Sequence, residues 1–120
     1  MHYSNQMQMR AMYSYINANI PSSVLAYKPK HEHLVERANE RDYDTSLVTK
    51  VIIQGINQYT DYFENRVRDC KHTLAFIHNE LTVVGVAFRN NDGKLGFSFR
   101  TCFYSEKVTQ SVVHKLKITM

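Results

Sequence analysis

A histidine and two arginines recur at a regular spacing in the first half of the chain. They are His33, Arg37 and Arg41, each four residues from the next. In a helix, four residues turn the chain about 40° beyond a full turn and rise about 6 Å, so these side chains would form one row. Imidazole exchanges a proton near neutral pH, and guanidinium groups match the oxygens of phosphate. The row therefore has the chemistry expected of a phosphodiester site.

An ordinary charged helix face explains the same spacing. A neighbouring row, one position earlier, holds Glu32, Glu36 and Glu40. Interleaved Glu and Arg side chains are common on solvated helices, where each pair stabilises the helix by about 0.2–0.5 kcal/mol. The spacing alone leaves both interpretations open.

A late strand, residues 95–104, supplies a further candidate. Its side chains should alternate between two faces. The more apolar face would hold Leu95, Phe97, Phe99, Thr101 and Phe103. The other face would hold Gly96, Ser98, Arg100, Cys102 and Tyr104. A cation in mid-strand needs solvent or an anionic partner, so Arg100 is either part of a phosphate site or an exposed arginine paired with a glutamate.

The segments before these strands predict helices. A helix within residues 1–20 has an apolar face made of Met9, Met12, Tyr13, Ile16 and Ile20. A second helix is expected over residues 30–41. Asp44 is a suitable N-cap for a third helix, and Gly55 or Asn57 a suitable end. The apolar face of the third helix would be Leu47, Val48, Val51, Ile52 and Ile56.

The second half of the chain predicts strands. Segments rich in β-branched and aromatic residues cover 73–77, 81–89 and 95–104, separated by turn-forming residues at 78–80 and 90–93. A further strand is expected within 59–67, and residues 108–120 fit either a helix or an edge strand. Helices followed by strands indicate an α+β fold, with two or three N-terminal helices packed on an antiparallel meander sheet of three to four strands.

Composition indicates one globular domain over residues 1–120, in which 1–20 form the N-terminal helix, 30–106 the core and 107–120 a tail. The chain is 43% hydrophobic and 22% charged. We expect a cytoplasmic protein, since no segment has the length and hydrophobicity of a membrane span or a signal peptide. The net charge of +4 is mild, but its sign suits a polyanionic partner.

Cysteine and histidine usage predicts no metal and no cofactor. Cys70 and Cys102 have neither a disulfide framework nor zinc-ligand spacing. His31 and His33 are two residues apart, which no helix face brings together. The chain has no phosphate-binding glycine loop and no nucleophile elbow. His72, His78 and His114 are expected to be surface histidines.

Three segments together resemble a known superfamily. The segment from His33 to Arg41, the helix over 44–55 and the strand segment Arg100-Thr101-Cys102-Phe103 are similar to the small barnase–EndoU–colicin–RelE-like ribonucleases, especially short versions encoded by bacteria and their phages. The resemblance covers residues 30–106. It implies helices packed on an antiparallel sheet, and RNA cleavage without a metal. The site residues it implies are His33, Arg37, Arg41, Arg100 and Thr101. We expect His33, Arg37, Arg100 and Thr101 to be catalytic groups, and Arg41 and Lys30 to bind substrate.

The reaction that this resemblance implies is transesterification within RNA. His33 would accept the proton of a ribose 2′-OH, which attacks phosphorus and leaves a 2′,3′-cyclic phosphate. Arg37 and Arg100 would stabilise the phosphate charge, and Thr101 would donate a hydrogen bond to it. The general acid stays open among His31, His72 and Tyr104. The partners would be mRNA or tRNA and a protein antitoxin. Alternatives are a phage protein that inhibits a host or defence protein, and an RNA-binding protein that does not cleave.

Overall fold

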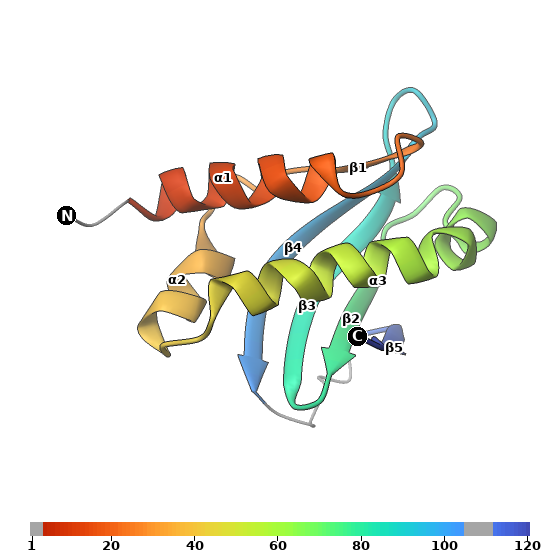
Figure 1. Cartoon of the computed structure of the whole chain (residues 1–120). Helices are drawn as coiled ribbons and strands as arrows, with labels where there is room; N and C mark the ends of the chain where they lie inside the picture. The colour runs from red at the N-terminus through yellow and green to blue at the C-terminus, as the bar shows by residue number, and fades with distance from the viewer. Residues whose placement is uncertain (1–3, 105–111) are drawn as a thin grey trace.

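Helices occupy the first half of the chain and strands most of the second half (Figure 1). The computed structural model describes residues 4–104 and 112–120. The elements are α1 (Asn5–Ala18), β1 (Val24–Ala26), α2 (His33–Glu40), α3 (Thr45–Arg66), β2 (His72–His78), β3 (Leu81–Arg89), β4 (Leu95–Tyr104) and β5 (His114–Lys117). The predicted α+β class is confirmed.

The sheet contains the three predicted strands at its centre and a short strand at each edge. β2, β3 and β4 form the expected antiparallel meander. β1 pairs with β4 and β5 pairs with β2, both in parallel, which gives the order β1-β4-β3-β2-β5. The sheet is therefore mixed and has five strands rather than the three or four expected. Strand β5 agrees with the edge-strand alternative, whereas β1 is too short to show a periodic pattern.

The third helix is longer than predicted. It runs to Arg66, so both the end expected at Gly55 or Asn57 and the strand expected within 59–67 are wrong. Gly55 is needed for close packing instead, because a Cβ atom there would lie 2.4 Å from the Phe76 ring of β2. The aromatic residue Phe63, in the segment predicted as a strand, is fully buried on the helix.

One face of the sheet and the helices enclose a single hydrophobic core. α3 lies across β2 and β3 (Figure 1), and α2 packs on β4. The sheet contributes side chains of one face, among them Leu74, Phe76, Val83, Ala87 and Phe97. Neighbours of these residues, such as Val86, Phe88 and Ser98, point to the opposite face. That face is available for a site.

A β-bulge at Arg100 changes the alternation of β4. Gly85 pairs with Phe99, but its neighbour Val84 pairs with Thr101, which leaves Arg100 as an extra residue. Beyond it the two faces exchange: Cys102 is fully buried and its Sγ lies 3.8 Å from the Leu34 carbonyl oxygen. The predicted placement of Thr101 on the core face and Cys102 on the polar face is therefore wrong.

The edge of β4 next to the bulge is held by α1. The hydroxyl of Tyr13 is buried and accepts a hydrogen bond from the Phe99 backbone N–H at 2.9 Å. Tyr13 thus binds the edge of β4 just beyond the residues that pair with β1. This hydrogen bond fixes the backbone directly before Arg100. In the part of the chain that the structure describes, no helix has both the length and the apolar character that a bilayer crossing requires.

Candidate functional site

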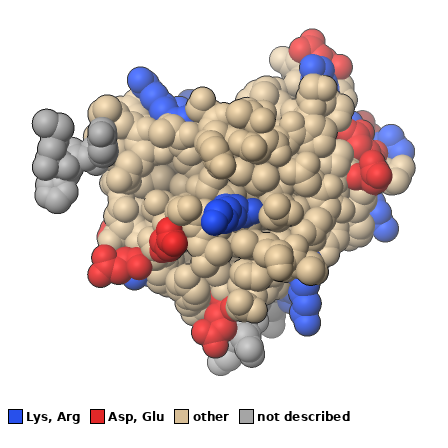
Figure 2. Space-filling view, viewed as in Figure 1, with Lys and Arg blue, Asp and Glu red and all other residues tan. Residues whose placement is uncertain are grey.

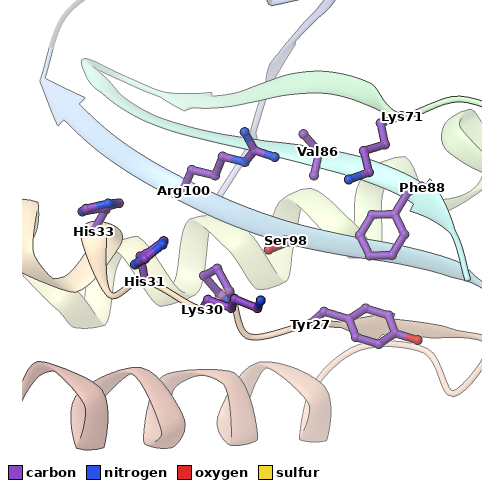
Figure 3. Close-up of a pocket in the computed structure, with 10 residues that line it drawn as sticks. Tyr27, Lys30, His31, His33, Lys71, Val86, Phe88, Ser98 and Arg100 are labelled. Atoms are coloured by element: carbon purple, nitrogen blue, oxygen red, sulfur yellow. The ribbon is translucent and has the colours of Figure 1, made fainter.

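A pocket of about 470 Å³ opens on the sheet face opposite α3. It lies where the segment between β1 and α2 crosses the edge of β4 (Figure 3). Strands β3 and β4 supply its floor with Val86, Phe88 and Ser98. Its volume is within the range of about 300–1,000 Å³ that is usual for ligand sites.

Three of the predicted site residues meet in this pocket. Lys30, His33 and Arg100 all line it, together with His31 and Lys71. No Asp or Glu is among the described residues that line it. By contrast, on the helix-covered side of the molecule Lys and Arg side chains are scattered over the surface, some of them beside acidic ones (Figure 2). Cations gathered in a concave surface attract and hold anions.

His33 is the first residue of α2, and its ring is oriented by the next turn of that helix. Its Nδ1 lies 3.2 Å from Glu36 Oε2. Because a carboxylate only accepts hydrogen bonds, this contact places the proton of a neutral ring on Nδ1 and leaves Nε2 as the acceptor. A histidine held in this way is suited to remove a proton.

His31 lies beside His33, contrary to the expectation from their spacing. Their ring centroids are 5.3 Å apart with an interplanar angle of 28°. The spacing argument was wrong because α2 begins only at His33, so His31 belongs to the preceding turn. Two imidazoles in one pocket can supply both a general base and a general acid.

Arg37, Arg41 and Thr101 do not line the pocket. Arg37 pairs with Glu40 on the exposed side of α2, at 3.8 Å, as the charged-face interpretation expects. The pocket lies at the N-terminal end of α2, and the next positions of the row are about 6 and 12 Å further along the helix. Arg41 follows α2 as its C-cap, and Thr101 lies beyond the bulge. The structure thus does not bring Arg37 and Thr101 of the predicted catalytic set, or Arg41 of the predicted substrate-binding groups, into the pocket.

Neither cysteine lines the pocket. Burial raises the pKa of the Cys102 thiol to about 11, against a smaller lowering by Arg41. Cys102 therefore stays protonated near neutral pH and has no thiolate to offer as a nucleophile.

The other candidates for the general acid are engaged elsewhere. Tyr104 packs edge-on against Tyr43, with ring centroids 4.5 Å apart. His72 Nδ1 lies 2.9 Å from His114 Nε2, and His114 Nδ1 lies 2.7 Å from the Tyr62 hydroxyl. This polar chain joins β2, β5 and α3, so His72 and His114 are partly buried rather than surface histidines. His31 is the one candidate of the three that lines the pocket.

The pocket also has an aromatic end that sequence reasoning missed. Tyr27 and Phe88 line it, with ring centroids 5.3 Å apart and tilted by 43°. In Figure 3 these rings lie at the end opposite His31 and His33. Tyr27 follows a strand too short to be predicted. A sequence signal did exist in Gly96, which lies directly opposite Phe88 in the sheet.

The described residues include no group of three or more His, Cys, Asp or Glu side chains that could hold a metal ion. Comparison of the chain with protein-family models, with curated proteins and with solved structures finds no match. The functional argument therefore rests on the geometry of the pocket.

Proposed function

We propose that the chain is an endoribonuclease that cleaves RNA without a metal, by attack of a ribose 2′-OH on the adjacent phosphorus. The observation that carries the proposal is the pocket that combines His31 and His33 with Lys30, Lys71 and Arg100. Two imidazoles supply proton transfer, and the cations supply electrostatic stabilisation of a phosphate. RNA in the cytoplasm, either mRNA or tRNA, is the proposed substrate.

In the proposed mechanism His33 Nε2 accepts the proton of the 2′-OH. The 2′-oxygen forms a bond to phosphorus while the bond from phosphorus to the 5′-oxygen of the next nucleotide breaks. His31, in its protonated form, donates a proton to that leaving oxygen. The products are a 2′,3′-cyclic phosphate and a 5′-OH, and the two histidines have exchanged protonation states.

Arg100 and Lys30 are assigned to stabilising the charge on the phosphate. As the 2′-oxygen attacks, negative charge grows on the non-bridging phosphate oxygens, and cations that are already in place stabilise it. A guanidinium binds two such oxygens at once, whereas an ammonium acts as a point charge. Arg100 is therefore assigned to the reacting phosphate. Arg37 and Arg41, outside the pocket, are assigned at most to flanking phosphates.

One observation favours a second candidate, an RNA-binding protein that does not cleave. The His33 side chain is 64% exposed, so the pocket does not exclude water from the proposed base. In that case the cations would hold RNA and the histidines would only add to the positive charge.

The deciding experiment incubates the purified protein with single-stranded RNA in excess EDTA. Cleavage products that mass spectrometry identifies as 2′,3′-cyclic phosphates support the proposal, and an all-deoxy strand of the same sequence should stay intact. Binding of intact RNA without cleavage would favour the second candidate. Cleavage that is lost in EDTA and restored by magnesium would contradict the mechanism.

A further inference from the structure

Tyr27 and Phe88 form the aromatic end of the pocket, beside its cations. Both rings are half-buried, so each keeps part of its surface open. Lys30 is near in sequence to Tyr27, and Lys71 lines the pocket with Phe88 (Figure 3). Flat aromatic surfaces next to positive charge bind a nucleobase together with its phosphate, because every base has a π-face and carries an anionic linkage.

We propose that Tyr27 and Phe88 form a stacking subsite for one unpaired nucleobase of the RNA whose phosphate lies at the histidine end. This inference deepens the proposed function and rests on it for the identity of the polymer. A base within a duplex stacks on its neighbours and cannot reach these rings. The subsite therefore selects single-stranded RNA.

The Tyr27 ring is held in place by contacts within the protein. The backbone N–H of Tyr27 donates to the Phe97 carbonyl oxygen at 2.7 Å, which ties this residue to β4. The hydroxyl of Tyr27 accepts a hydrogen bond from Asn90 Nδ2 at 2.8 Å. Asn90 Oδ1 in turn accepts from the backbone N–H groups of Asp92 and Lys94. The tip of the β3–β4 hairpin thus sets the position of one ring.

Gly96 leaves the space in which both rings lie. A Cβ atom at this position would be 2.8 Å from the Tyr27 ring and 3.0 Å from the Phe88 ring. The φ of Gly96 is not positive, so the backbone conformation does not require glycine here. Glycine is required here by the two rings, because they lie directly against the strand with no side chain between them and its backbone.

The test uses binding, so that it does not depend on cleavage. The probe is a fluorescently labelled 2′-O-methyl RNA hexamer, whose blocked 2′-oxygen cannot attack. Its matched partner carries the same phosphates on tetrahydrofuran spacers and has no bases. The wild-type protein should bind the base-containing strand more tightly by roughly 5- to 150-fold, the range expected for one base–aromatic stack.

Leucine variants then assign that preference to the two rings. Tyr27→Leu and Phe88→Leu should each lose most of the preference and bind the spacer strand as the wild type does, because the cations are unchanged. The control is Tyr15→Leu, which removes an exposed ring on α1 and should keep the full preference.

A second variant reads stacking directly. The chain contains eight tyrosines but no tryptophan, so Phe88→Trp introduces a single tryptophan, whose fluorescence can be excited apart from that of the tyrosines, while keeping an aromatic face. The hexamer with bases should quench it to saturation, and the spacer strand should not.

Equal binding of the two strands by the wild type, or a preference that survives both leucine variants, would overturn the subsite even if the protein cleaves RNA. Preference without cleavage would leave the subsite standing and overturn the proposed nuclease.

Discussion

His33 and Arg100 line the same pocket although they come from different layers of the fold. His33 opens α2, and Arg100 is the extra residue of the bulge in β4. Bulges redirect side chains next to functional sites. The relationship separates Arg100, which lines the pocket, from Arg37 and Arg41, which do not, and it makes the proposed mechanism testable.

His33→Ala should lower RNA cleavage by at least about 100-fold, the low end of a general-base contribution. Cleavage is measured as initial rate on a fluorogenic single-stranded RNA. The matched control is Glu32→Ala, since Glu32 does not line the pocket and its loss should change the rate little. Both variants should fold normally, because the His33 side chain is 64% exposed and Glu32 makes no side-chain cap hydrogen bond, and changes at such positions usually shift stability by about 0.5 kcal/mol or less. Equal rates in the two variants would indicate that the row of His33, Arg37 and Arg41 is only a charged helix face.

Arg100→Ala should lower kcat/KM by about 100- to 1,000-fold, as loss of a group that stabilises charge in the transition state does. Arg100→Lys should restore only part of it, because an ammonium cannot bind two phosphate oxygens at once. Arg37→Ala is the matched control, since Arg37 pairs with Glu40 outside the pocket, and it should retain most activity. A larger loss from Arg37→Ala than from Arg100→Ala would indicate that the phosphate binds along the row of His33, Arg37 and Arg41 on α2 and not in the pocket.

His31→Ala should slow cleavage of RNA by about 100-fold, the low end for a general acid. The same variant should cleave a nucleoside 3′-(4-nitrophenyl phosphate) at nearly the wild-type rate, because nitrophenolate leaves without a proton. Comparison of the two substrates separates an acid from a residue that only binds. If the variant loses both activities equally, His31 does not protonate the leaving group.

Gly55→Ala should destabilise the fold, measured by urea unfolding. Alanine is favoured over glycine within a helix by about 1 kcal/mol, but the added methyl would meet the Phe76 ring at 2.4 Å, and overpacking of a core costs about 1–3 kcal/mol. Adding Phe76→Leu should recover part of the loss. A stabilised Gly55→Ala protein would show that this position is not close-packed.

Acid should weaken the fold in part through His114. Burial, followed by the charges of His72 and Arg66, lowers the pKa of His114 below its usual 6.5. As the pH falls below about 6.5, the unfolded chain takes up a proton that the folded ring resists, so this contribution is complete above that pH and is lost toward the lowered pKa. The decrease in Tm from pH 7.5 to 5.5 should be smaller in His114→Gln than in the wild type. An equal decrease would remove His114 as a cause.

Local patterns predicted the elements but not where their side chains meet. The apolar spacing of α1, the N-cap at Asp44 and the β-branched and aromatic residues of β3 and β4 were sufficient for the fold class. The prediction for Gly55 was wrong, because the sequence does not distinguish a glycine that ends a helix from a glycine against which an aromatic ring packs. Only the partner strand, with Phe76, distinguishes them.

Only some of the residues that line the pocket could be predicted from the sequence. His33, Lys30 and Arg100 were among the predicted site residues, and all three line the pocket. Arg37 was chosen together with His33 because of their helical spacing. That spacing does not show at which end of the helix a pocket lies. Tyr27 and Lys71 follow or precede strands, and only the pairing of β1 with β4 and of β2 with β3 brings them together.

The edges of the sheet affect how the chain behaves among its own copies. Strand β3 pairs on both sides, whereas the outer edge of β4 pairs with β1 only over Leu95–Phe97. In the described residues the edge strands β1 and β5 have only three and four residues. Short edge strands offer few free N–H and C=O groups to a second molecule. Removal of β5 would unpair the four residues of β2 from Leu74 to Ile77 and leave this seven-residue strand as the edge, and such a truncated chain would be prone to pair strand-to-strand and aggregate.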